Sequence, residues 1–224
     1  GAFGDGPVPA QRIAFAIGTY ERTLIPDQTP WDRYMAGETG AMTPLQVQGW
    51  NTFNNSLCSF CHMPPMFSDQ EFHNIGIRPP DEDLGRIVVS ENEIDRGRFK
   101  TPTLRNGGLK PTFMHNGRLN SIEESVLWYR TGNPDRSDDN LDVFVPADLP
   151  AEELPGVVDF LAHGLTDPRV AAESFPFDRP TLRSQLLPPA GVMYGAGSPG
   201  TGNRVPQVLA EVPANAGNVD FKDG

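Results

Sequence analysis

The sequence predicts a mostly α-helical domain with long loops, followed by an extended arm rich in Gly and Pro. Apolar residues recur at helical spacing in several short segments, each with a start or stop signal. The stretch 63–117 is rich in Pro, Gly, Asp and Asn and has little sustained period, as loops do. From about residue 175 onward no helical stripe remains. We therefore divide the chain into a domain at 1–175 and an arm at 176–224.

The first helix is predicted for Pro9 to Leu24, where apolar residues recur three and four positions apart and give an amphipathic pattern. Two prolines follow and end it. The second helix is predicted to begin after Thr43, with Pro44 at its first position and Gln46 completing a capping box. It runs directly towards Cys58.

The third helix is predicted from Ser121, which opens a second capping box, through Tyr129. The last helix is predicted for Ala151 to His163, closed by Gly164 and interrupted or kinked near Pro155. The Gly- and Pro-rich arm cannot build a core of its own. We expect it to be mobile or to lie across a neighbouring surface.

Charge and hydropathy exclude some functions. The formal charge is −11 and the pI is about 4.7, with no cluster of Lys and Arg, so nucleic acid and anionic membrane are poor partners. No apolar run approaches the roughly 18 residues that a membrane-spanning helix needs. The first residues do not form a signal peptide, so we take Gly1 as the start of a processed chain or of a segment of a longer one.

Cys58-Ser-Phe-Cys61-His62 is the C-x-x-C-H pattern of covalent haem attachment. One helical turn places both sulfurs on the same face, and His62 can then reach the iron. A redox dithiol, a pair of zinc ligands and a disulfide are the competing interpretations. Zinc needs four ligands, and neither a second Cys pair nor a βαβ setting for a dithiol is visible. We predict one covalent haem c, held by Cys58, Cys61 and His62.

The fold class is therefore a cytochrome c-like helical domain wrapped round one covalent haem. Both cysteines are consumed by the attachment, so no structural disulfide is expected. Thioether attachment is made on the outer side of the bacterial inner membrane. We accordingly predict a periplasmic or extracellular location.

Four further segments carry a family resemblance: Tyr20-Glu-Arg-Thr-Leu24, Phe72-His-Asn-Ile-Gly76, Phe99-Lys-Thr-Pro-Thr-Leu-Arg-Asn106 and Phe113-Met-His-Asn-Gly117. Together they resemble the bacterial di-haem cytochrome c peroxidase and MauG family, over roughly Pro9 to Pro168. The match is to the second, C-terminal haem domain of that family, whose first haem activates peroxide. The sequence contains a single C-x-x-C-H. The resemblance therefore implies an electron-transfer half that serves a peroxidatic haem on another segment or subunit.

The resemblance also implies where the second axial ligand of the iron lies. It places this ligand on the helix after the Met-His-Asn-Gly turn, at Tyr129, where peroxidases of the family generally have Met and MauG-type proteins have Tyr. A phenolate lowers the reduction potential and a thioether raises it. On general grounds Met114, some fifty residues after His62, is the alternative. The remaining candidates are Met63, Met66, His73 and His115.

Other residues receive weaker predictions. Arg105 is favoured over Lys100 as the partner of the haem propionates. His73 and His115 are predicted to be hydrogen-bonded structural residues, with an electron or proton relay as the alternative. The resemblance implies a calcium ion on the carbonyls of Lys110 and Thr112, provided that the other haem domain is present. The tryptophans are predicted to be core residues, with electron hopping as the alternative; they are Trp31, Trp50 and Trp128.

The leading interpretation is a c-type cytochrome domain that transfers one electron at a time to a redox protein partner or a second haem domain. No residue of the chain is assigned as catalytic. Two alternatives remain. The chain is part of an active peroxidase or MauG-like oxidase whose peroxidatic haem lies on another segment or subunit, or it is a structural and conductive subunit of a multi-cytochrome assembly.

Overall fold

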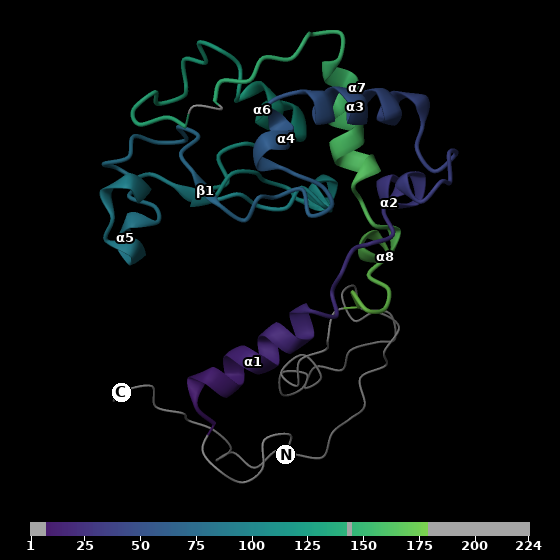
Figure 1. Ribbon diagram of the computed structural model, residues 1–224, viewed down its shortest axis with the longest axis horizontal. Helices are drawn as coiled ribbons and strands as arrows, with labels where there is room; N and C mark the ends of the chain where they lie inside the picture. The colour runs from purple at the N-terminus through teal and green to yellow at the C-terminus, as the bar shows by residue number, and fades with distance from the viewer. Residues whose placement is uncertain (1–7, 143–144, 179–224) are drawn as a thin grey trace, which may run out of the picture. The chain divides into compact units, whose positions relative to one another are not determined.

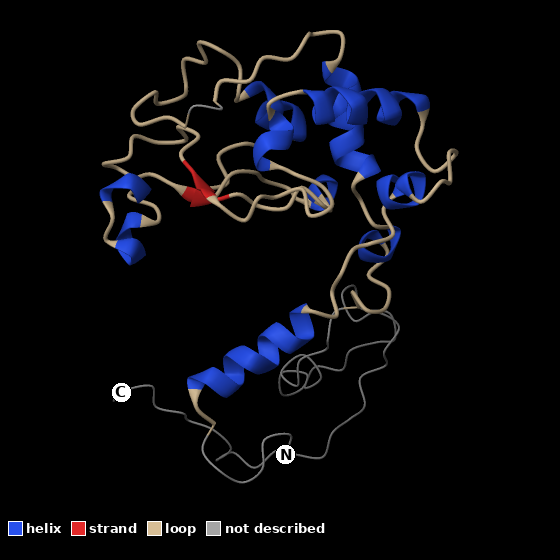
Figure 2. Ribbon diagram, in the orientation of Figure 1, coloured by secondary structure: helices blue, strands red, loops and turns tan. Residues whose placement is uncertain are grey.

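The computed structural model describes residues 8–142 and 145–178. The described part consists of short helices and long loops with one two-stranded sheet, so the predicted mostly α fold class is confirmed (Figures 1 and 2). Two compact units divide the chain, one of residues 1–172 and one of residues 173–224. The predicted arm, 176–224, lies outside the described residues from position 179 onward.

The first predicted helix is present as α1, Ala10–Glu21. Its apolar stripe does not enter a core, because none of its residues is buried. Ile13 and Ile17 remain 51% and 53% exposed. The predicted helix is therefore confirmed, and its apolar residues stay exposed.

Two helices open with the same chemistry. In α3, Pro44–Asn55, the Thr43 side chain accepts a hydrogen bond from the Gln46 backbone, and the Gln46 side chain accepts one from Thr43 in return, as predicted. In α2, Pro30–Met35, Thr29 and Asp32 form the same reciprocal pair. Pro30, one of the two prolines that follow the first predicted helix, is therefore the first residue of α2. This position tolerates proline because it needs no backbone N–H.

The stretch predicted as loops holds only short elements. The strands β1, Phe72–His73, and β2, Phe99–Lys100, pair antiparallel, with Phe72 opposite Lys100 and His73 opposite Phe99. The helical elements here are single turns. They are α5 at Ile87–Ser90, η1 at Glu93–Asp95 and η2 at Gly107–Leu109, and the single turn α4, Cys58–Cys61, comes just before the stretch.

The third predicted helix is shorter than expected. α6 spans Ile122–Leu127, and Tyr129 lies just beyond its C-cap residue Trp128. Ser121 caps the helix by accepting from the Glu124 backbone at 3.0 Å. The Glu124 carboxylate, however, accepts from the backbone of Asn120 and not from that of Ser121. Only half of the predicted capping box is therefore formed.

The fourth predicted helix begins later than expected, as α7, Leu154–Asp159. Pro155 lies in its first turn, where it causes no kink, so the predicted interruption is wrong. The helix continues as the π-helical turn η3, Phe160–Gly164. A last short helix, α8, spans Pro168–Ala171.

The core lies where α3 crosses α7 and η3 (Figure 1). The crossing is close because two glycines meet: a Cβ on Gly49 would lie 1.9 Å from the carbonyl oxygen of Gly156. Aromatic rings fill the space beside them, and the predicted burial of the three tryptophans is confirmed. The buried cluster consists of Trp31, Met42, Trp50, Phe53, Phe67, Val157, Phe160, Leu161 and Leu165.

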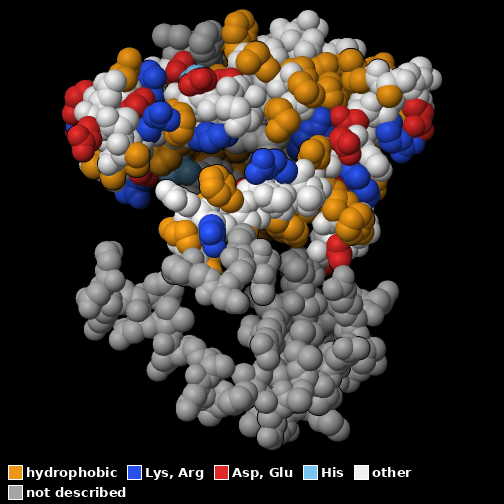
Figure 3. Space-filling model, turned by 60° about the horizontal axis from the view of Figure 1, so that its bottom comes forward, with side chains coloured by type: hydrophobic (Ala, Val, Ile, Leu, Met, Phe, Trp, Pro, Cys, Tyr) orange, Lys and Arg blue, Asp and Glu red, His pale blue; other side chains and the backbone are white. Residues whose placement is uncertain are grey.

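None of the helices among the described residues is both long and apolar enough to cross a membrane. On the face shown in Figure 3, basic and acidic side chains are interspersed with hydrophobic ones. That surface resembles neither a lipid-facing belt nor a basic groove for nucleic acid.

The helix crossing gives a prediction about stability. Gly49→Ala should destabilise the protein by about 1–3 kcal/mol or more, because the new methyl group must push apart two backbones rather than a flexible side chain. Urea unfolding measures the change. Gly40→Ala is the matched control, since its Cβ would meet no atom within 4 Å. Equal stability of the two variants would contradict the crossing described above.

Candidate functional site

The two cysteines of the C-x-x-C-H motif lie at the two ends of the single turn α4. Both are free thiols and both are half-buried. Burial raises the pKa of the Cys58 thiol. Burial, followed by the negative charges of Asp69 and Asp142, raises the pKa of Cys61 to about 11. At neutral pH both side chains are therefore protonated thiols at the same face of one helical turn.

His62 follows directly as the C-cap residue of α4. Its Nδ1 lies 3.0 Å from the carbonyl oxygen of Phe67. A carbonyl can only accept, so Nδ1 carries the proton and the lone pair is on Nε2. Burial lowers the pKa of His62, so the ring is neutral at pH 7. A neutral imidazole with a fixed tautomer is the form that binds a metal through Nε2.

The loop that carries the Phe67 carbonyl is held by Arg105. The guanidinium donates from Nε to the carbonyl of Pro65 at 2.9 Å and from Nη1 to the carbonyl of Pro26 at 2.7 Å. Two further bonds of 2.7 Å reach both carboxylate oxygens of Asp32. The Arg105 side chain is only 6% exposed. The structure thus gives its donors protein partners, and the predicted contact with a haem propionate stays a prediction.

A second charged group lies beside Cys61. His73 on β1 places Nε2 2.7 Å from Asp69 and Nδ1 2.8 Å from Asp142. The Cys61 sulfur and the ligand atoms of Asp69 and His73 all lie within 4.8 Å of one another. Partial burial acts to lower the pKa of His73, but the hydrogen bonds to Asp142 and Asp69 outweigh it and raise that pKa above 6.5.

Tyr129 lies within electrostatic range of the two cysteine sulfurs. Burial, followed by repulsion from the Cys58 and Cys61 sulfurs, raises the pKa of its phenol above the ordinary value of 10. Its carbonyl accepts from the backbone of Ala147 at 2.7 Å. Arg136 holds the neighbouring carbonyls, donating from Nη1 to Trp128 at 3.2 Å and to Arg130 at 3.0 Å. The end of α6 is therefore fixed on both sides of Tyr129.

The other candidate ligands have different surroundings. Met114 is half-buried in a turn and adopts a left-handed φ of 65°. Met63 and Met66 are about half exposed. His115 stacks on Phe99, with ring centroids 3.6 Å apart, and bonds to Asp83 at 2.7 Å.

The remaining predicted residues lie at the surface or nearby. Lys100 donates to the carbonyl of Thr101 at 3.0 Å. Lys110 and Thr112 are exposed, and the calcium ion stays a prediction. The sequence interpretation missed Asp32, Asp69 and Asp142. Asp32 had a signal, because Thr29-Pro-Trp-Asp32 repeats the capping pattern of the next helix.

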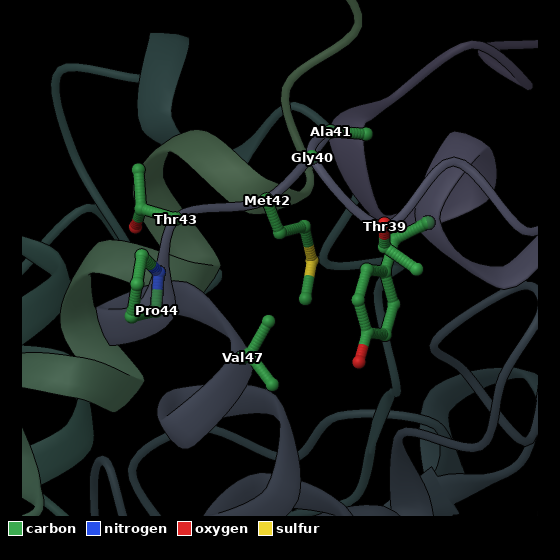
Figure 4. A pocket seen from close by; sticks show the side chains of 8 residues that line it. Thr39, Gly40, Ala41, Met42, Thr43, Pro44 and Val47 are labelled. Carbon is green, nitrogen blue, oxygen red and sulfur yellow. The ribbon is translucent and has the colours of Figure 1, made fainter.

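One hollow of the surface does not belong to this site. It lies between α2 and α3, and Figure 4 shows the side chains of Met42 and Val47 pointing towards each other across it. Its lining contains no Cys, His or carboxylate.

Comparison with known proteins agrees with this site. The chain is 34% identical over 135 residues to the methylamine utilization protein MauG of Methylophilus methylotrophus, covering 58% of this chain and 40% of that protein. It is also 34% identical over 128 residues to the cytochrome c551 peroxidase of Nitrosomonas europaea, covering 55% and 38%. The chain thus spans well under half the length of these relatives. No protein-family model matches it.

Solved structures show the same likeness. A MauG-like protein associated with microbial copper homeostasis has a TM-score of 0.62 and 25% identity, covering 76% of this chain and 62% of that one. The di-haem peroxidase BthA from Burkholderia thailandensis shares the fold, with a TM-score of 0.53 and 22% identity. The resemblance to the MauG and cytochrome c peroxidase proteins is confirmed, and BthA is described as a di-haem peroxidase.

The pairing of His73 predicts a pH dependence of stability. A pKa that is higher in the folded than in the unfolded state stabilises the protein fully below about 6.5, and this stabilisation is lost as the pH rises through the folded value. The free energy of unfolding should therefore differ more between the parent and His73→Gln at pH 6 than at pH 9. Urea titrations at both pH values measure this difference.

The matched control is His163→Gln, which removes an exposed imidazole paired with a single carboxylate, Asp159. A parent-to-variant difference for His73→Gln that grew with rising pH would show that the ring is neutral in the folded protein.

Proposed function

We propose that the chain is a c-type cytochrome domain that carries single electrons through one haem attached to Cys58 and Cys61. The observation that supports this most directly is His62, a neutral and tautomerically fixed imidazole placed immediately after two protonated thiols on one turn. A disulfide would need the two sulfurs to be bonded, and they are not. The donor set fits covalent haem, and the haem-bearing relatives agree with it.

Each residue has a defined task in this proposal. Cys58 and Cys61 attach the porphyrin, and Nε2 of His62 binds the iron. The Phe67 carbonyl keeps the ring of His62 in one orientation, which limits rearrangement when the oxidation state changes. The bound haem supplies a one-electron couple. The buried aromatic cluster behind α4 keeps bulk water away from that side of the site.

We further propose Tyr129 as the second axial ligand. Its support is the electrostatic influence of both cysteine sulfurs on its phenol and the fixation of its backbone on either side. Tyr129 would hold ferric iron through its phenol oxygen as a phenolate, with the phenolic proton released to solvent, and the positive charge of the iron would offset the cost of burying the anion. Met114 remains the alternative ligand. A periplasmic or extracellular location, a redox protein partner and the Arg105–propionate contact belong to the same proposal.

A second candidate function rests on the relatives. They are named as a MauG protein and as cytochrome peroxidases, and this chain matches only part of each. In this alternative the domain works within a peroxidase or MauG-like oxidase and passes electrons to or from a peroxidatic haem elsewhere. Rapid turnover of hydrogen peroxide by this chain alone would contradict the purely electron-carrying proposal.

Haem attachment is tested by exporting the chain to a bacterial periplasm that carries the attachment machinery. The parent should gain the mass of one haem, retained after denaturation, and show a reversible ferric–ferrous couple. The Cys58→Ala, Cys61→Ala double variant should gain none. Ser59→Ala, inside the same motif, is the matched control and should load fully. A parent with no added mass would exclude the proposal.

The axial ligand is tested on the haem-loaded protein. Tyr129→Phe should change the ferric absorption spectrum and spin state, because the phenyl ring cannot replace an oxygen ligand. Met114→Leu is the companion variant and should leave both unchanged. The reverse pattern would make Met114 the ligand, and the same spectrum in all three proteins would exclude both.

A further inference from the structure

The side chains of Asp69, His73 and Asp142 form a group that the electron-transfer proposal does not use. We call it the Asp–His–Asp cluster. His73 lies between the two carboxylates, with bonds of 2.7 Å and 2.8 Å. The side chains of Asp69, His73 and Asp142 are 10%, 18% and 12% exposed. Interactions between such charges are screened by water much less than those between surface ion pairs.

Two segments position the three members, because Asp69 and His73 are four positions apart and Asp142 is 69 positions from His73. His73 lies on β1, opposite Phe99 of β2. The backbone of Asp69 donates to the carbonyl of Cys61 at 2.7 Å. The backbone of Asp142 donates to the carbonyl of Asn74 at 3.0 Å. Asn74, only 2% exposed, also donates from Nδ2 to the carbonyls of residues 139 and 140. The cluster is therefore held by backbone contacts and does not depend on side chains alone.

The charge of the cluster follows from its geometry. Carboxylate oxygens accept hydrogen bonds, so a ring with one carboxylate at each nitrogen is best satisfied when both nitrogens carry a proton. That state is an imidazolium between two carboxylates, with a net charge of −1. The raised pKa of His73 agrees with it.

The cluster lies against the haem attachment. The sulfur of Cys61 and the nearest ligand atoms of Asp69 and His73 are all within 4.8 Å of one another. A haem bonded to the Cys61 sulfur would therefore lie beside this cluster. Ferric haem carries one more positive charge than ferrous haem. Negative charge beside the sulfur that attaches the haem therefore favours the ferric state.

We propose that Asp69, His73 and Asp142 form a built-in charge cluster that sets the reduction potential of the haem attached to Cys61. The inference rests on the proposed haem attachment. His73 acts by cancelling one of the two carboxylate charges, and it needs no contact with the iron. Within this proposal His73 is a positioned charge and not an axial ligand.

The test uses two variants of the haem-loaded protein whose charge changes have opposite signs. His73→Gln removes the positive charge, leaves two carboxylates and should lower the reduction potential. Asp142→Asn removes a negative charge and should raise it. Each shift should correspond to a several-fold to tenfold change in the equilibrium constant for reduction. A tenfold change equals about 59 mV for one electron. Redox titration followed by absorbance measures both.

The opposite signs separate charge from structure. A variant that merely loosened the loop would expose the haem. Such loosening would shift the reduction potential in the same direction whichever member of the cluster is changed. His163→Gln and Asp159→Asn repeat the two substitutions in a pair whose imidazole is 71% exposed, and they should leave the potential nearly unchanged. Ferric spectra that match the parent's would show that the axial ligands are retained.

Two outcomes would overturn the inference. Shifts of the same sign in His73→Gln and Asp142→Asn would assign the cluster a structural role only. If the parent had a reversible haem couple and the variants had the same potential, the proposed effect of the cluster on the potential would be excluded. The electron-transfer proposal would remain intact. Failure of haem attachment in the parent is a separate result and would contradict the proposed function itself.

Discussion

The guanidinium of Arg105 joins its own segment to two others that are distant in the sequence, residues 26–32 and the loop at Pro65. It bonds to the carbonyl of Pro26, to the carboxylate of Asp32 and to the carbonyl of Pro65, and it is almost fully buried. A buried ion pair contributes little net stability while it is intact. Removal of one partner is costly, about 3–5 kcal/mol, because the other charge is left without compensation. Such a group therefore specifies one arrangement of the segments and penalises the others.

The site depends on that arrangement in two steps. Arg105 holds the loop at Pro65, and two residues later the Phe67 carbonyl holds the ring of His62. The phenyl ring of Phe67 is fully buried and packs edge-on against Trp31, with centroids 4.9 Å apart. The orientation of the imidazole is thus decided by an ion pair and an aromatic core on the opposite side of the loop. Asp32 has two roles, because it accepts hydrogen bonds from Arg105 and also completes the capping box of α2.

The parts that the sequence predicted are those encoded locally. The C-x-x-C-H motif, the Thr43 capping box and the mostly helical class each depend on residues within a few positions of one another. Contacts between residues that are distant in the sequence were not predicted. Asp142 meets His73 across 69 positions, and Arg105 meets Asp32 across 73. No periodicity or motif signals such pairs. The kink expected at Pro155 failed for a related reason, because the helix start that makes this proline harmless is set by packing of α7 on α3.

The bond between His62 and Phe67 uses a main-chain oxygen, which every amino acid possesses. Substitution at position 67 therefore cannot delete the acceptor, whatever side chain it introduces. What a substitution there can change is the backbone shape, because φ is +52°, a region that most residues enter reluctantly, and the ring of Phe67 is fully buried. The orientation of the His62 ring thus depends on the packing of its neighbours. A substitution at position 67 acts on this ring through the shape of the loop and not through its own chemistry.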